Sequence, residues 1–145
     1  MPVSLIFQAL LQFAGVTMIV LALAHFGLSK LLAWQEDTRK LTPINRQVFI
    51  VHTVFLAVGI FLLGLVCLFF AAAFFEKTTL ATVATGSFAM CWLSRLVCQI
   101  FIFRSEITNN KQLNSFLQVA GTMLWTFYTG LFTALFLYQI GVITN

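Results

Sequence analysis

Four long apolar runs occupy most of the chain, and short polar segments separate them. The runs cover residues 3–33, 44–75, 79–103 and 116–140. A helix needs about 20 residues to cross the roughly 30 Å of hydrocarbon in a bilayer, and each run is long enough. The pattern therefore predicts an all-α fold: an integral membrane, up-down-up-down four-helix bundle that forms a single transmembrane domain.

The polar segments carry residues that typically end or begin helices. Residues 34–40 end the first run, and Thr42-Pro43 then provides an N-cap residue followed by proline at the first helical position. Residues 76–79 predict a tight turn, and residues 105–115 predict a longer connection. Gly141 is suited to stop the last helix.

Composition agrees with a membrane location. Of the 145 residues, 61% are hydrophobic and 8% are charged, whereas soluble domains average about 25% charged residues. The net charge of +4 does not indicate nucleic-acid binding, because that requires a basic patch on a folded domain. We therefore expect membrane lipid as a partner and no nucleic acid.

The basic residues are unevenly distributed between the connections. The first connection carries Lys30, Arg39, Lys40 and Arg46, the third carries Arg104 and Lys111, and the second has only Lys77. Cytoplasmic loops are enriched in lysine and arginine. The distribution of charge thus predicts that both termini lie on the non-cytoplasmic side, with Trp34 at the inner interface. We expect the protein to lie in a bacterial inner membrane.

Several polar residues lie within the apolar runs, and their depths match. His25 and His52 lie at similar distances from the first connection, on adjacent predicted helices. Arg95 and Gln99 are one turn apart on the third helix and therefore share a face. Gln118 and Thr122 enter the fourth helix from the same side of the membrane. The four helices are predicted to contribute to one interhelical polar layer.

Arg95 is the most informative of these residues. A charged side chain at the bilayer centre costs at least about 2.5–3.5 kcal/mol on insertion scales. The acidic residues, Glu36, Asp37, Glu76 and Glu106, all lie outside the runs. The guanidinium must therefore be met by carbonyls, Gln99, the histidines, water or an external anion, such as a lipid phosphate, a haem propionate or a carboxylate of another subunit. We predict that His52, Arg95 and Gln99 face the bundle interior or a protein contact.

Two interpretations of the polar layer differ in function. In the first, hydrogen bonds between His25, His52, Arg95, Gln99 and their neighbours hold the helices together. In the second, the same residues bind a cofactor, haem b or a quinone, with the two histidines as axial ligands and Arg95 on a propionate. Thr122, Thr126, Thr129 and Thr133 recur at spacings of four, three and four, which favours a helix-packing face.

Catalytic chemistry has little support in the sequence. The runs contain no acidic residue, so a Ser-His-Asp set within the membrane is excluded, and no metal-binding motif is present. The three cysteines, Cys67, Cys91 and Cys98, lie in apolar runs, where an odd number does not indicate a disulfide framework. We expect no catalytic residues and no metal site.

Two segments carry a resemblance. Residues 45–52, Asn-Arg-Gln-Val-Phe-Ile-Val-His, and residues 92–101, Trp-Leu-Ser-Arg-Leu-Val-Cys-Gln-Ile-Phe, resemble small bacterial four-helix integral membrane proteins of uncharacterised activity. The resemblance implies the same topology and brings no activity with it.

The sequence predicts a small non-catalytic membrane subunit that packs against other membrane proteins in a larger complex, or against copies of itself. One alternative is a haem- or quinone-binding subunit for electron transfer or anchoring. A second alternative is a small channel or transporter in which Arg95 attracts anions.

Overall fold

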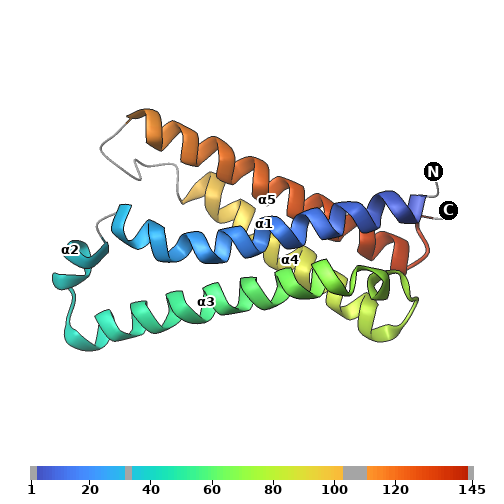
Figure 1. Cartoon of the computed structure of the whole chain (residues 1–145), viewed down its shortest axis with the longest axis horizontal. Coiled ribbons are helices and arrows are strands. Elements are labelled where there is room, and N and C mark those ends of the chain that lie inside the picture. Colours follow the sequence, from blue (N-terminus) through green and yellow to red (C-terminus); the bar gives the residue numbers. More distant parts are fainter. Residues whose placement is uncertain (1–2, 32–33, 103–110, 144–145) are drawn as a thin grey trace. The chain divides into compact units, whose positions relative to one another are not determined.

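The computed structural model describes residues 3–31, 34–102 and 111–143. The chain folds into α1 (Val3–Leu31), α2 (Trp34–Arg39), α3 (Pro43–Phe69), the 3-10 helix η1 (Ala71–Phe75), α4 (Thr79–Phe101) and α5 (Lys111–Gln139). Of these, α1, α3, α4 and α5 are long and apolar enough to cross a membrane. The prediction of an all-α fold with four such helices is confirmed (Figure 1).

Local sequence explains where three of the helices begin or end. Pro43 is the first residue of α3, after an extended Thr42, although the Thr42 side chain makes no capping hydrogen bond. The Thr78 hydroxyl accepts a hydrogen bond of 3.1 Å from the Ala81 N–H and caps α4. Gly141 follows α5 with a φ of 78°, a conformation that favours glycine. The expected stop at Gly141 is therefore confirmed.

Other boundaries differ from the expected ones. The run at residues 44–75 is not one helix, since α3 ends at Phe69 and the five residues of η1 follow. Hydropathy alone cannot distinguish these two kinds of helix. Conversely, some polar segments are helical. The short helix α2 forms where only the end of the first run was expected, and α5 begins at Lys111, before the start of the predicted run at residue 116. Parts of the predicted spans and connections lie outside the described residues: 32–33 at the end of the first run, Phe103 at the end of the third, and 104–110 in the third connection, which include Arg104 and Glu106.

The chain divides into two compact units, which are described separately. One unit comprises Ala9–Ala71, and the other comprises Met1–Gln8 and Ala72–Asn145. The single transmembrane domain expected from the sequence stays a prediction.

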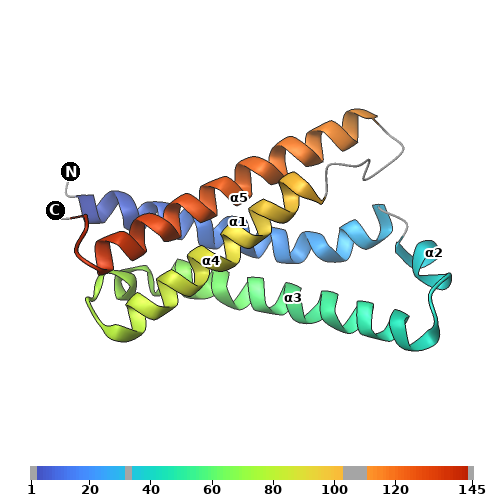
Figure 2. The ribbon, with the colours of Figure 1, turned by 180° about the vertical axis from the view of Figure 1, so that it is seen from behind.

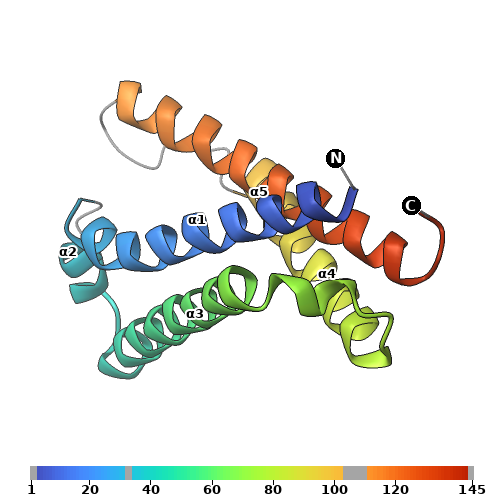
Figure 3. The same cartoon turned by 45° about the vertical axis from the view of Figure 1, so that its right-hand side comes forward.

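In the unit Ala9–Ala71, α1 and α3 run in opposite directions and meet at two glycines. A Cβ atom built on Gly15 would lie 2.6 Å from the Gly64 carbonyl oxygen, and one built on Gly64 would lie 2.9 Å from the Gly15 oxygen. The backbones are thus in direct contact at this crossing. From there α1 and α3 separate towards α2 (Figures 1 and 3).

In the other unit, α4 and α5 lie antiparallel and side by side (Figures 1 and 2). Large aromatic side chains fill the space between them, and Tyr128 and Phe132 are fully buried. The Phe132 ring contacts Phe88 and Phe74 edge to face, at centroid distances of 5.4 and 6.2 Å. The Gln139 amide donates a hydrogen bond of 2.5 Å to the Phe74 carbonyl and ties η1 to the end of α5.

Candidate functional site

The polar residues of α4 and α5 form a continuous hydrogen-bonded cluster. The Arg95 Nη1 donates to Gln99 Oε1 at 3.2 Å, and Gln99 Nε2 donates to Gln118 Oε1 at 2.8 Å. Trp125 Nε1 also donates to Gln99 Oε1, at 3.3 Å. We call Arg95, Gln99, Gln118 and Trp125 the arginine cluster. The predicted pairing of Arg95 with Gln99 is present, and Gln118 joins it from α5.

Trp125 also contacts the charge of Arg95 directly. The guanidinium carbon lies 4.6 Å from the centre of the Trp125 ring, within the range of a cation–π interaction. The Trp92 ring stacks on the Trp125 ring at a centroid distance of 5.6 Å. It also contacts the Tyr128 ring, at a centroid distance of 4.6 Å. Within α4 and α5, which contain no acidic residue, the Arg95 guanidinium thus meets an aromatic face and an amide oxygen.

Sequence reasoning missed Trp125, although its position in the sequence indicates its place. Gln118 and Trp125 are seven residues apart, about two turns, so they share a face of α5. Gln99 is buried, with 5% of its surface exposed, and Arg95 is half-buried. The presence of a Trp on the same face of α5 as Gln118 therefore indicated that it could join the polar contacts of Arg95.

Arg95 reaches towards the end of its helix. It lies six residues before Phe101, the last residue of α4, or about 9 Å along the axis. Its guanidinium hydrogen-bonds to Gln99, a residue one turn closer to that end. Long basic side chains commonly direct their charge towards the membrane interface in this way.

His25 and His52 lie in the other unit, on α1 and α3. The Nδ1 atom of His25 is 2.8 Å from the Leu21 carbonyl oxygen, and that of His52 is 3.0 Å from the Val48 oxygen. The His25 ring is half-buried, whereas His52 is exposed, so His52 is not in the interior of its unit. The prediction of one polar layer that joins both histidines to Arg95 stays a prediction.

The threonines of α5 bond to their own helix. The hydroxyls of Thr122, Thr126 and Thr129 each donate to the carbonyl four residues earlier, at 2.7–2.8 Å. Thr122 and Thr129 are half-buried, whereas Thr126 and Thr133 are exposed. The predicted packing face is therefore open along one edge.

That edge belongs to a longer exposed stripe on α5. Its members recur every three or four residues: Phe116, Val119, Met123, Thr126, Gly130 and Thr133. We call these six residues the α5 stripe. Its first half carries large apolar side chains, and its second half carries small ones. No atom lies within 4 Å of a Cβ built on Gly130, so this part of the surface is open.

Comparison with protein-family models, with curated proteins and with solved structures found no match to this chain. The resemblance to small bacterial four-helix membrane proteins stays a prediction. Among the described residues, no three His, Cys, Asp or Glu side chains are grouped to hold a metal ion.

Proposed function

We propose that this chain is a non-catalytic integral membrane subunit that associates with a helix of another membrane protein through the α5 stripe. The observation that carries the proposal is the open surface at Gly130, between Thr126 and Thr133. Small residues at such spacing let two helix backbones approach closely in a membrane.

The geometry of the stripe suits a helical partner. Exposed positions that alternate at spacings of three and four follow the 3.5-residue period of two helices packed at a shallow angle. Thr126 and Gly130 are four residues apart, which is the small-x-x-x-small spacing of close helix pairs. Lipid has no comparable requirement for small residues, so the composition of the stripe favours a protein partner.

We expect a photoreactive amino acid at position 126 to crosslink to a second polypeptide in native membranes. Gly130→Leu should abolish that adduct, because the added side chain fills the open surface without meeting any atom of its own chain. Gel mobility and mass spectrometry of the adduct give the size and sequence of the partner. A second copy of this chain would identify a homo-oligomer.

Gly59→Leu is the matched control. A Cβ on Gly59 also meets no atom within 4 Å, but Gly59 lies on α3 rather than on the α5 stripe. This variant should retain the adduct. If position 126 crosslinks only to lipid, or if both variants behave alike, association through the α5 stripe is refuted.

We further propose that α2 faces the cytoplasm and that both termini face away from it, in a bacterial inner membrane. The excess of Lys and Arg in the first and third connections supports this orientation. With the native cysteines replaced by alanine, Lys40→Cys should react with a membrane-impermeant thiol reagent only after the inner face is exposed. Reaction of Lys40→Cys in intact cells would reverse the orientation.

Haem b binding between α1 and α3 is a second candidate. Each histidine Nδ1 lies at hydrogen-bond distance from a backbone carbonyl, an arrangement that directs Nε2 towards a ligand in many metal sites. His25 and His52 are ten and twelve residues from the glycine crossing, or about 15 and 18 Å, where the helices separate.

An absorption spectrum of the purified protein tests this candidate. Haem ligation predicts a Soret band that is lost in both His25→Ala and His52→Ala. A colourless protein, purified from cells supplied with haem precursor, would exclude ligation by these histidines.

A further inference from the structure

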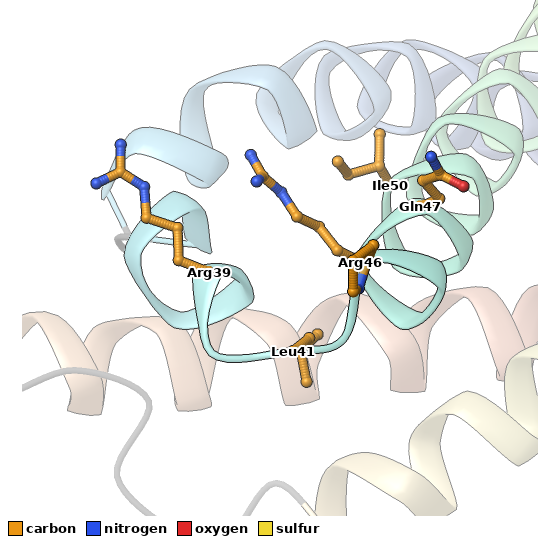
Figure 4. A pocket seen from close by; sticks show the side chains of 6 residues that line it. Arg39, Leu41, Arg46, Gln47 and Ile50 are labelled. Atoms are coloured by element: carbon orange, nitrogen blue, oxygen red, sulfur yellow. The ribbon is translucent and has the colours of Figure 1, made fainter.

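A hollow of about 390 Å³ lies at the turn that joins α2 to α3, within the unit Ala9–Ala71. Its lining combines two arginines and an amide with three apolar side chains: Arg39, Leu41, Pro43, Arg46, Gln47 and Ile50. Figure 4 shows that the guanidinium groups of Arg39 and Arg46 extend to the same side of this turn. We call this feature the arginine hollow.

Arg39 and Arg46 have no carboxylate at ion-pair distance among the described residues. Lys40 pairs with Asp37 at 3.9 Å, whereas neither Arg39 nor Arg46 forms an ion pair within the part of the chain that the structure describes. Arginine is effectively always protonated in proteins. The hollow therefore presents two fixed charges to any ligand that enters it.

The start of α3 adds to this positive potential. The first backbone N–H groups of a helix lack intrahelical acceptors. Pro43 has no N–H, and the Arg46 N–H bonds to the Thr42 carbonyl, so the N–H groups of Ile44 and Asn45 remain for a ligand. The Thr42 side chain makes no capping bond there. The positive end of the helix dipole favours an anion at the same place.

The arginine hollow lies at the first residues of α3, a helix long and apolar enough to cross a membrane. Trp34 packs edge to face on Phe49, with ring centroids 5.5 Å apart, and thereby holds α2 against the first turns of α3. Tryptophan is enriched at the level of the headgroups. After Arg46, the residues of α3 are predominantly apolar and exposed, as expected for a segment that contacts the acyl chains of lipids.

We propose that the arginine hollow binds the phosphate group of an anionic phospholipid. Arg39 and Arg46 hold the phosphate oxygens, because a guanidinium fork matches their geometry. The Gln47 amide contacts the glycerol oxygens, and Leu41 and Ile50 contact the start of the acyl chains. The inference rests on the membrane insertion in the proposed function, but not on association through the α5 stripe.

The test measures binding of short-chain phosphatidylglycerol to the full-length protein in a neutral detergent, by the rise in unfolding temperature as lipid is added. Phosphatidylcholine with the same acyl chains and inorganic phosphate are titrated in parallel. We expect phosphatidylglycerol to bind at least tenfold more tightly than either. Arg39→Gln/Arg46→Gln should weaken its binding by about tenfold or more, since each basic residue near the surface contributes appreciably.

Lys40→Gln/Lys77→Gln is the matched control, because it also removes two positive charges and neither lysine lines the hollow. Its affinity should change less than threefold. Equal losses in both double variants would reduce the effect to general charge attraction and overturn the site. Tight binding of inorganic phosphate would assign the site to a free anion, and tight binding of phosphatidylcholine would show that the arginines do not select charge.

Folding of the variants is checked separately. Arg39 and Arg46 are exposed, so their replacement should leave the unfolding temperature without lipid unchanged. Arg39→Lys/Arg46→Lys keeps both charges and loses the planar fork. It should therefore bind with intermediate affinity, and wild-type affinity in this variant would overturn the bidentate contact.

Discussion

Gly15→Ala is expected to destabilise the protein more than any other single-methyl addition considered for α1 or α3. The new Cβ would lie 2.6 Å from the Gly64 carbonyl oxygen and 2.8 Å from the Leu68 nitrogen. Both are backbone atoms, so no side-chain rotation can relieve the overlap, and the helices must move apart. Overpacking of this kind costs about 3 kcal/mol. Reversible unfolding in mixed detergent micelles measures the loss.

Gly64→Ala should behave similarly, since its Cβ would lie 2.9 Å from the Gly15 oxygen. Gly59→Ala is the control on the same helix, because no atom lies within 4 Å of its Cβ. It should be neutral or stabilising by up to about 1 kcal/mol, as alanine is the better helix former. Equal stability of Gly59→Ala and Gly64→Ala would contradict the close crossing of α1 and α3.

Much of the helical fold was predictable from residue order alone. Hydropathy identified four runs, and the Thr42-Pro43 pair and Gly141 located two helix ends correctly. These features depend on neighbours in sequence, which explains why they were accessible. The end of α3 at Phe69 was not, because the five residues of η1 are as apolar as the helix before them.

Contacts between helices were only partly predictable. Gly59 and Gly64 lie in the same apolar run, and their spacing of five residues does not form the usual close-packing motif. The two differ only in their neighbours. α1 approaches Gly64 so closely that a Cβ would not fit, whereas no atom lies within 4 Å of a Cβ built on Gly59. Arg95 and Gln99 were foreseeable as a pair because one helical turn separates them. Trp125 is 26 residues from Gln99, so its bond depends on how α4 and α5 pack.

The arginine cluster determines the second large effect. Gln99 Oε1 accepts from both Arg95 and Trp125, and Gln99 Nε2 donates to Gln118. Gln99→Leu removes all three bonds in one substitution, and the side chain is buried. Interhelical hydrogen bonds in membranes contribute about 0.6 kcal/mol on average and up to about 1.7. We therefore expect Gln99→Leu to lower the free energy of unfolding by about 2–4 kcal/mol.

Arg95→Leu should cost less than Gln99→Leu. Removing Arg95 leaves Gln99 Oε1 bonded to Trp125 and also removes a charge that costs about 2.5–3.5 kcal/mol at the membrane centre, although less near the helix end. The lost bond to Gln99 and the lost contact with the Trp125 ring outweigh that gain by a small margin, because Arg95 lies near the end of α4. Gln99→Glu is a useful third variant, because it replaces the single amide oxygen beside Arg95 by the two oxygens of a carboxylate while removing the donor to Gln118. The order of stability, measured by unfolding in mixed micelles, should be wild type, then Arg95→Leu, then Gln99→Leu. If Arg95→Leu is the less stable of the two leucine variants, the charge of Arg95 contributes more than the acceptor that holds it, and Gln99 is not the residue on which the cluster depends.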